Sequence, residues 1–144
     1  MRIGIVSGTS AYWLAGDPAL SEREHSSASN YRQQGARKTQ ENSFVRGSQS
    51  KVIDRGNILH TISFTTWRLF NTAHEAELWT LNYEASTPHS GSLRILSPIA
   101  GGGETNRYVH NCVIDPPSFE ITGCTVKITY TVRGGAITSN PTPP

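Results

Sequence analysis

Three residues offer the clearest case for chemistry: His110, Cys112 and Cys124. A β-hairpin centred near Ser118 would place Cys112 opposite, or nearly opposite, Cys124, with Cβ atoms about 4.5–5.5 Å apart. The thiols then either stay free and pack as small apolar groups, or form a cross-strand disulfide in oxidising surroundings. A zinc site that includes His110 is the third alternative, but no fourth ligand stands at a recognised spacing. We favour two free, buried thiols.

The remaining candidate residues do not form a catalytic pattern. His60 falls on the apolar face of a strand, as core and interface histidines do, whereas His25, His74 and His89 lie in polar, surface-like surroundings. No serine occupies a G-x-S-x-G turn, and the carboxylates are scattered rather than paired. We therefore predict no enzymatic activity, no catalytic residue, no metal site and no cofactor.

Alternating apolar residues predict the strands that position these side chains. A short strand covers residues 2–6, and Tyr12, Trp13 and Leu14 follow as a plug for the core or for a neighbouring subunit. In residues 58–67 one face consists of Ile58, His60, Ile62, Phe64 and Thr66. Residues 121–133 alternate with core-facing positions at Cys124, Val126, Ile128, Tyr130 and Val132. The outward positions of that strand are Thr125, Lys127, Thr129, Thr131 and Arg133.

A single helix is predicted by the capping box Thr72-Ala73-His74-Glu75, in which the Thr72 hydroxyl accepts from the Glu75 amide. The helix runs to about Ala85. Its apolar stripe consists of Ala73, Ala76, Trp79 and Tyr83, widened by Leu78 and Leu81. Trp79 is predicted to anchor the helix on the sheet. With further strands at 93–96 and 108–114 and a turn at 115–118, the fold class is mainly β: an antiparallel sandwich or barrel-like fold with one flanking α-helix.

The 144 residues fit one domain, 1–144, but its apolar residues are unevenly distributed. The polar segment at about 15–51 contains almost nothing apolar beyond Leu20, Tyr31, Phe44 and Val45. We predict that it forms a long arm or loop. Within it, residues 42–54 could form a hairpin with Gly47-Ser48 near its tip, and 54–57 give a turn or bulge signal. The Pro-rich segment at about 138–144 is expected to be a flexible tail.

The net charge of +2 is too small to argue for nucleic-acid binding. The polar segment is locally basic, which suits either a solvated loop or an arm that docks on an acidic partner. No apolar run is long enough to cross a membrane, and the run after Met1 is too short for a signal peptide. We expect a protein made in the cytoplasm that contacts no membrane.

The order of elements resembles the tail-tube fold of siphophage tail-tube and distal tail proteins, which is shared by tube proteins of contractile injection systems. The resemblance covers roughly residues 38–137. It is carried by Asp54-Arg55-Gly56-Asn57 before the strand from Ile58 to Phe64, by the capped helix, and by the run from Gly123 to Gly135. It implies a virion protein of the tail, synthesised in the bacterial host cytoplasm, whose partners are its own copies and other tail proteins.

The resemblance also implies a homo-hexameric ring, either of the tube or of a small baseplate hub, with a lumen that conducts DNA without specific binding. Six subunits with four strands each give about 24 strands and an open passage of roughly 35–40 Å. The stripe Thr125, Lys127, Thr129, Thr131 and Arg133 would line it, although its two cations are unexpected beside phosphate. The polar segment would be the assembly arm, with contacts from Arg37, Lys38, Phe44, Val45 and Arg46.

Other functions fit the same pattern. A tail terminator or adaptor protein would use the same ring-forming fold. A monomeric ligand-binding β-barrel would have the helix at one end and a pocket inside. A small hydrolase would need His60 or His110 beside a nucleophile, which the sequence does not indicate.

Overall fold

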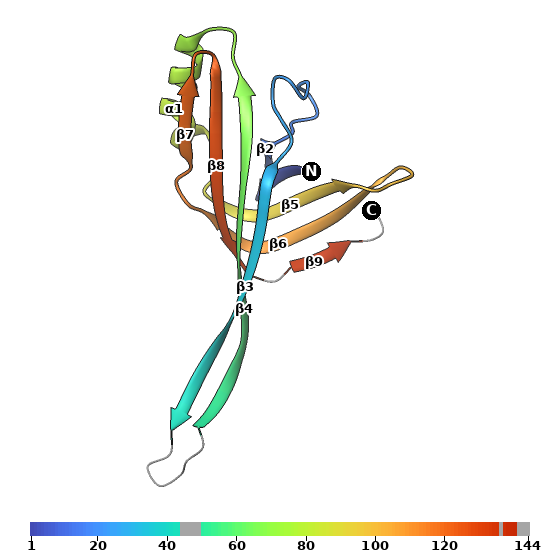
Figure 1. Cartoon of the computed structure of the whole chain (residues 1–144), viewed down its shortest axis with the longest axis vertical. Coiled ribbons are helices and arrows are strands. Elements are labelled where there is room, and N and C mark those ends of the chain that lie inside the picture. The colour runs from blue at the N-terminus through green and yellow to red at the C-terminus, as the bar shows by residue number, and fades with distance from the viewer. Residues whose placement is uncertain (44–49, 136, 141–144) are drawn as a thin grey trace.

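The computed structural model describes residues 1–43, 50–135 and 137–140. The described chain is mainly antiparallel β-structure with a single helix, as predicted (Figure 1). Its elements are β1 (Arg2–Ser7), β2 (Ser10–Ala15), β3 (Ser29–Ser43), β4 (Ser50–Leu69), α1 (Ala73–Ser86), β5 (Ser90–Pro98), β6 (Glu104–Ile114), β7 (Ser118–Thr122), β8 (Thr125–Gly134) and β9 (Ile137–Asn140).

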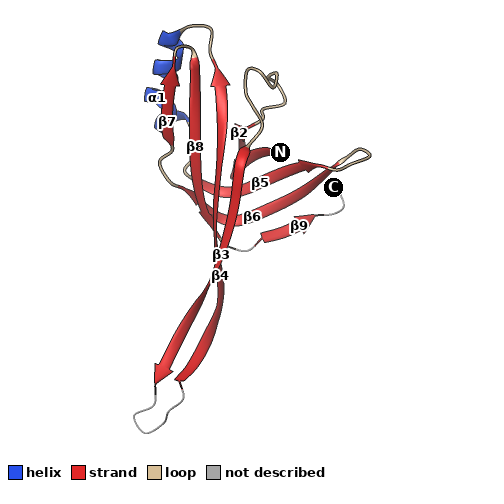
Figure 2. Ribbon diagram, viewed as in Figure 1, coloured by secondary structure: helices blue, strands red, loops and turns tan. Residues whose placement is uncertain are grey.

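The strands follow the order β2-β1-β5-β6-β8-β4-β3, with β7 beside β8 and β9 beside β6. Two limbs result: the β4 limb of β3, β4, β8 and β7, and the β5 limb of β2, β1, β5, β6 and β9. Only the pairs Val113–Arg133 and Ile114–Val132 join β6 to β8. Figure 2 shows β5 and β6 running across the direction of β4 and β8. The sheet therefore folds over itself around one core, and among the described strands it does not close into a barrel.

The core lies between the two limbs. Ile3, Ile5 and Ile95 enter it from the β5 limb, and Phe64 and Ile128 enter it from the β4 limb, all at most 1% exposed. On β8 the predicted alternation is confirmed, because Val126, Ile128, Tyr130 and Val132 are all buried. The rings of Phe64 and Tyr130 stack with centroids 5.1 Å apart, which fixes the faces of β4 and β8 that point inward.

The predicted strand at 121–133 is two strands joined by a tight turn. Gly123, with φ of +61°, lies in the turn between β7 and β8, a backbone conformation that glycine adopts without a Cβ clash. Cys124 lies in the same turn and is only partly buried, so its assignment to the core face was wrong. Ser118, which we expected in the turn, begins β7 and pairs with Thr129.

The helix begins as its capping box predicts. The Thr72 hydroxyl accepts from the backbone N–H of Glu75 at 3.2 Å, and the helix ends at Ser86. Two residues of the helix, Ala76 and Tyr83, are buried, but Leu78 and Leu81 are 43% and 78% exposed. The predicted widening of the apolar stripe was therefore wrong, and the helix covers the sheet with a narrow stripe.

Residues 15–51 do not form one structureless segment. Residues 16–28 make a loop that is bonded to the body, for example by Ser26 N–H to Trp67 O at 2.9 Å, and β3 follows. The hairpin is therefore longer than the predicted 42–54. Residues 54–57 form a bulge rather than a turn, since Arg37 pairs with Ile58 whereas Thr39 pairs with Asp54. The predicted tip, Gly47-Ser48, lies outside the described residues.

The C-terminal segment is also more ordered than predicted. Residues 137–140 form β9, which pairs with β6 between Asn106 and Val109. Residues 141–144 lie outside the described residues. Tyr12-Trp13-Leu14, predicted as a plug, lies in β2: Leu14 is buried in the core, whereas Tyr12 is 41% exposed.

Candidate functional site

The most unusual surface is the two-stranded end of the β3–β4 hairpin. The pairing of β4 with β8 ends at His60 and Gly134, whereas its pairing with β3 continues to Ser43 and Ser50. We call residues 38–43 and 50–57 the ribbon. It extends away from the body along the longest axis of the molecule (Figure 1). A two-stranded hairpin by itself is marginally stable in water, so the ribbon gains from a partner.

The predicted arm residues divide between the body and the ribbon. Arg37 pairs with Ile58 at the base of the ribbon, and Lys38 is the residue opposite the bulge. Phe44, Val45 and Arg46 lie outside the described residues. Arg37 and Lys38 therefore lie in a strand that begins earlier than the predicted hairpin, at Ser29.

Several strands have a neighbour on one side only. Within the described ranges, β3 pairs only with β4, β7 only with β8, β2 only with β1 and β9 only with β6. Every second backbone amide and carbonyl of such an edge points outward and can pair with another strand. β3 is the longest of these edges, with 15 residues.

The predicted stripe on β8 lies on the face opposite the core. Lys127 faces Glu120 across the β7–β8 pair, and its Nζ lies 5.9 Å from the centre of the Trp67 ring. Arg133 forms an ion pair with Asp115 at 3.2 Å. The remaining members, Thr125, Thr129 and Thr131, are uncharged. Each cation of the stripe therefore has a carboxylate beside it, and the charge of this face is close to balanced.

Trp79 lies between the helix and the β7–β8 hairpin. Its ring centroid is 5.6 Å from Phe70, 5.5 Å from Tyr83 and 5.7 Å from Phe119, and the last two contacts are edge-to-face. The guanidinium of Arg68 lies 5.3 Å from the Trp79 ring centroid. The indole thus contacts residues from β4, α1 and β7, in the position that an anchor of helix on sheet requires.

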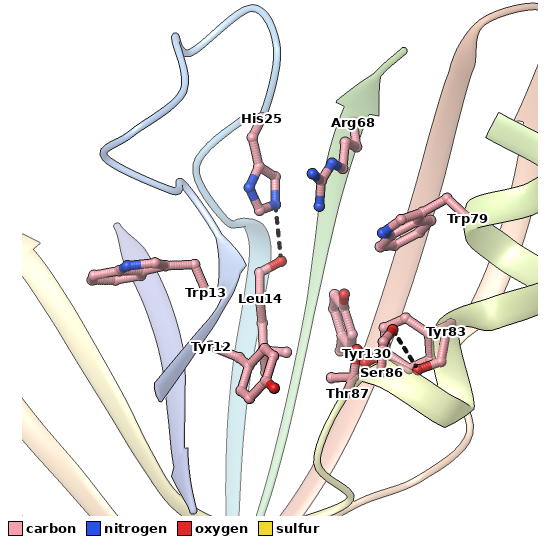
Figure 3. A pocket seen from close by; sticks show the side chains of 10 residues that line it. All are labelled: Tyr12, Trp13, Leu14, His25, Arg68, Trp79, Tyr83, Ser86, Thr87 and Tyr130. Atoms are coloured by element: carbon pink, nitrogen blue, oxygen red, sulfur yellow. Dashed lines mark hydrogen bonds between the residues drawn. The ribbon is translucent and has the colours of Figure 1, made fainter. Parts of the chain in front are cut away.

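A cleft opens beside Trp79, between β2 and the helix (Figure 3). His25 lies at its edge, 3% exposed, and pairs with Arg68 of β4 through a backbone bridge. Its Nε2–H donates to the Leu14 carbonyl at 3.1 Å, and its Nδ1 accepts from the Asp17 N–H at 3.3 Å. These bonds require the neutral ring. The prediction that His25 is a surface residue was wrong, because its polar neighbours in sequence fold over it.

Stability is expected to fall on acidification because of His25. Burial, and then the positive charge of Arg68, lower the pKa of His25 below its ordinary 6.5, although the Leu14 bond and the carboxylates of Asp17 and Glu22 act in the opposite direction. The unfolded chain therefore takes up this proton first. The stabilisation is complete above about pH 6.5 and is lost as the pH falls toward the lower pKa of the folded state.

Urea unfolding at pH 7.5 and pH 5.5 measures this loss. His25→Gln, which keeps a donor and an acceptor, is expected to show a smaller decrease in the free energy of unfolding than the wild type. His74→Gln, at an exposed position, is the matched control and keeps the wild-type decrease. An equal decrease in the His25 variant would contradict the assignment.

The cysteine and histidine candidates are not brought together. Cys112 is buried beside Gly91 of β5 and next to Gly134, at one end of β8. Cys124 lies at the other end of β8, about 30 Å along the strand from Gly134. The predicted opposition of the two thiols was wrong, and the disulfide and zinc alternatives that depended on it fail. His110 stacks on Tyr108, with centroids 6.5 Å apart. The described residues hold no cluster of three metal-ligating side chains.

His60 is half-buried between Gly35 of β3 and Gly134 of β8. Its Nδ1 is buried and has no hydrogen-bond partner among the described residues. The hydrolase alternative required a nucleophile beside His60 or His110, and among the described residues none is bonded to the Nδ1 of His60.

Sequence reasoning missed Arg68, which lies in the cleft. Its position carried a signal, because Phe64, Thr66, Arg68 and Phe70 alternate on one face of the strand. An arginine at a position that faces the core is unusual, because charged side chains are rarely buried. The fold shows that Arg68 lies at the end of the core, where the strand reaches the cleft.

Comparison with known proteins gives a weak similarity. No protein-family model matches the chain, and no curated protein matches it. Among solved structures, the chain is similar to one from the tail of an empty GTA (gene transfer agent) particle, obtained by helical refinement with C6 symmetry. The two chains are 10% identical, the alignment covers 97% of this chain and 95% of the other, and the TM-score is 0.47. This level does not establish a shared fold or function.

The described residues include one helix, α1, and it lacks the length and apolar character that a membrane-spanning helix requires.

Proposed function

We propose that this chain is a structural subunit of a phage tail, which forms a homo-oligomeric ring of the tail tube or distal tail. The ring is a hexamer, and DNA passes through it without specific binding. The protein functions in the virion as a non-enzymatic component, in contact with other tail proteins. The observation that carries the proposal is the ribbon, a long two-stranded projection from the body.

The ribbon supports assembly, because ordering its backbone costs conformational entropy and no other described element pairs with it. Fixing one residue of backbone costs about 1–2 kcal/mol, and a two-stranded hairpin by itself is only marginally stable. A neighbouring subunit would supply a surface on which the ribbon could pack. Arg37 and Lys38, at its base, are proposed as contact residues.

The open edges support a closed ring in the same way. β3 and β7 are the two edges of the β4 limb, and an edge of one subunit can pair with an edge of the next. Repetition of one such contact by rotation closes a ring and covers these two edges in every subunit.

The outer face of β8 suits a passage for DNA. Lys127 and Arg133 lie beside Glu120 and Asp115, so the face does not present an unbalanced positive charge to phosphate. Attraction of phosphate scales with the number of uncompensated cations, and a balanced wall lets the duplex slide. The pairing of the two cations with carboxylates supports the proposal that this face lines the lumen.

A tail terminator or adaptor would also form a ring, and the geometry of one subunit does not favour it over a tube. The monomeric β-barrel alternative is weakened, since the described strands leave both ends of the sheet open.

Light scattering coupled to size exclusion tests the proposal directly. The expected species has a mass of about six times the 15.7 kDa of one chain. Negative-stain images should show rings or stacked rings with a central opening. The proposal fails if the protein stays monomeric at high concentration, and also in the presence of the other tail proteins.

A further inference from the structure

The cleft beside the helix has a composition that assembly by strand edges does not explain. It has a volume of about 190 Å³ and lies where the two limbs separate, at the end of the body that carries the helix (Figure 3). Aromatic rings from β2, the helix and β8 form most of its wall, namely Tyr12, Trp79, Tyr83 and Tyr130, whereas the ring of Trp13 points to the other side of β2 (Figure 3). Arg68 supplies its only permanent charge.

Arg68 forms no ion pair with a carboxylate of the described residues. The ion pairs within the described residues are Arg2–Glu104 and Arg133–Asp115, and neither involves it. Its guanidinium lies 5.3 Å from the ring centroids of both Phe70 and Trp79. These aromatic contacts hold the guanidinium plane in place, but they leave its N–H groups without an anionic acceptor. Figure 3 shows the group pointing between His25 and Trp79 into the cleft.

Tyr83 provides a second, independent observation. The residue is 3% exposed, and its hydroxyl is buried next to the hydroxyls of Tyr130 and Thr87, without a hydrogen bond of ordinary geometry among the described residues. A buried hydroxyl whose hydrogen bonds are incomplete gains from a further acceptor. Tyr83 contacts the same Trp79 ring as Arg68 does, at 5.5 Å between centroids, so a cation and a buried hydroxyl group lie beside one ring.

We propose that this cleft is a binding site for a carboxylate carried on a short planar or apolar stem, with the carboxylate on Arg68 and Tyr83 and the stem among the aromatic rings. A carboxylate matches the planar fork of guanidinium and accepts from a phenol hydroxyl. The stem must be small, because the cleft is below the 300–1,000 Å³ typical of drug-sized ligands. A free small carboxylic acid and an acidic side chain of a neighbouring protein both carry this chemistry. The inference does not depend on the proposed function.

Titration with sodium benzoate, monitored by ¹⁹F NMR of protein labelled with 5-fluorotryptophan, tests the site. The Trp79 ring lines the cleft, whereas Trp67 lies elsewhere and is an internal control. A saturable shift is expected for the Trp79 resonance and none for the Trp67 resonance. Benzamide has the same shape without the charge, and it should bind about tenfold more weakly. The absence of saturable binding, or equal binding of benzamide, would overturn the proposal.

Two variants separate binding from folding. Arg68→Met keeps an apolar stem over Trp79 and should weaken benzoate binding about tenfold or more, whereas Arg23→Met, at an exposed position, should leave it unchanged. Tyr83→Phe removes the hydroxyl and keeps the ring, so its midpoint of thermal unfolding should stay close to that of the wild type, while benzoate binds more weakly. A lower midpoint with unchanged binding would mean that the hydroxyl is structural and would overturn the assignment.

The source of the carboxylate is distinguished by a competition experiment on the assembled protein. If benzoate dissociates the assembly, and Arg68→Met assembles poorly, the natural occupant is an acidic side chain of a neighbouring protein. If assembly is unaffected while benzoate still binds, the occupant is a free carboxylic acid. Because benzoate binding is measured directly on the subunit, a protein that binds benzoate but never assembles contradicts only the proposed function.

Discussion

Replacement of Trp79 by alanine is expected to lower the free energy of unfolding by about 3 kcal/mol. The half-buried indole contacts the rings of Phe70, Tyr83 and Phe119, which come from the β4–α1 connection, from α1 and from β7. Ala76 and Tyr83 are the residues of the helix that are fully buried. Truncation leaves a cavity under the helix, and it also removes the aromatic face on which the Arg68 guanidinium lies. Urea unfolding followed by circular dichroism measures the change.

Leu81→Ala is the matched control for this experiment. It lies on the same helix and is 78% exposed, so its truncation should change stability by less than about 0.5 kcal/mol. If the two variants were equally stable, the helix would be held by its connections to β4 and β5 rather than by the indole.

Removal of the ribbon is expected to abolish assembly while the body stays folded. Arg37 and Ile58 face each other across β3 and β4, so Asn-Gly in place of residues 38–57 closes the hairpin with a two-residue turn. The excised segment makes no strand pair with β8, since that pairing stops at His60. Size exclusion with light scattering should give a monomer at concentrations where the wild type forms rings.

Thermal unfolding of the same variant provides its control. A midpoint within a few degrees of the wild type shows that the body is intact, because a loss of about 1 kcal/mol would shift it by roughly 2–8 °C. Rings formed by the shortened protein would show that the strand edges are sufficient and that the ribbon has another role.

Local chemistry predicted several elements correctly. The capping box located the start of the helix, because the Thr72 hydroxyl and the Glu75 amide need no tertiary contact to meet. The alternation on β8 located its buried face, because apolar side chains on one face of a strand are buried together. These residues are Val126, Ile128, Tyr130 and Val132. Patterns that are satisfied within a few residues are readable from sequence alone.

Other features depend on distant partners and could not be predicted. β3 is polar over its length, and it is a strand because β4 provides its hydrogen bonds, not because of its own apolar pattern. His25 is buried because Leu14 and Arg68, which are remote in sequence, enclose it. The cleft residues come from β2, β4, α1 and β8, so no local pattern contains the site.

The position of β1 in the sheet sets the order in which the chain can fold. β1 pairs with β5, for example at Arg2 and Leu96, which are far apart in sequence. β1 therefore cannot pair with β5 until most of the chain has left the ribosome. The two strands of the ribbon, in contrast, pair only with each other and close a short loop. Pairings that are so distant in sequence form slowly, on the scale of milliseconds to seconds in proteins of this class. During synthesis, the ribbon is therefore complete before the core of the body has formed.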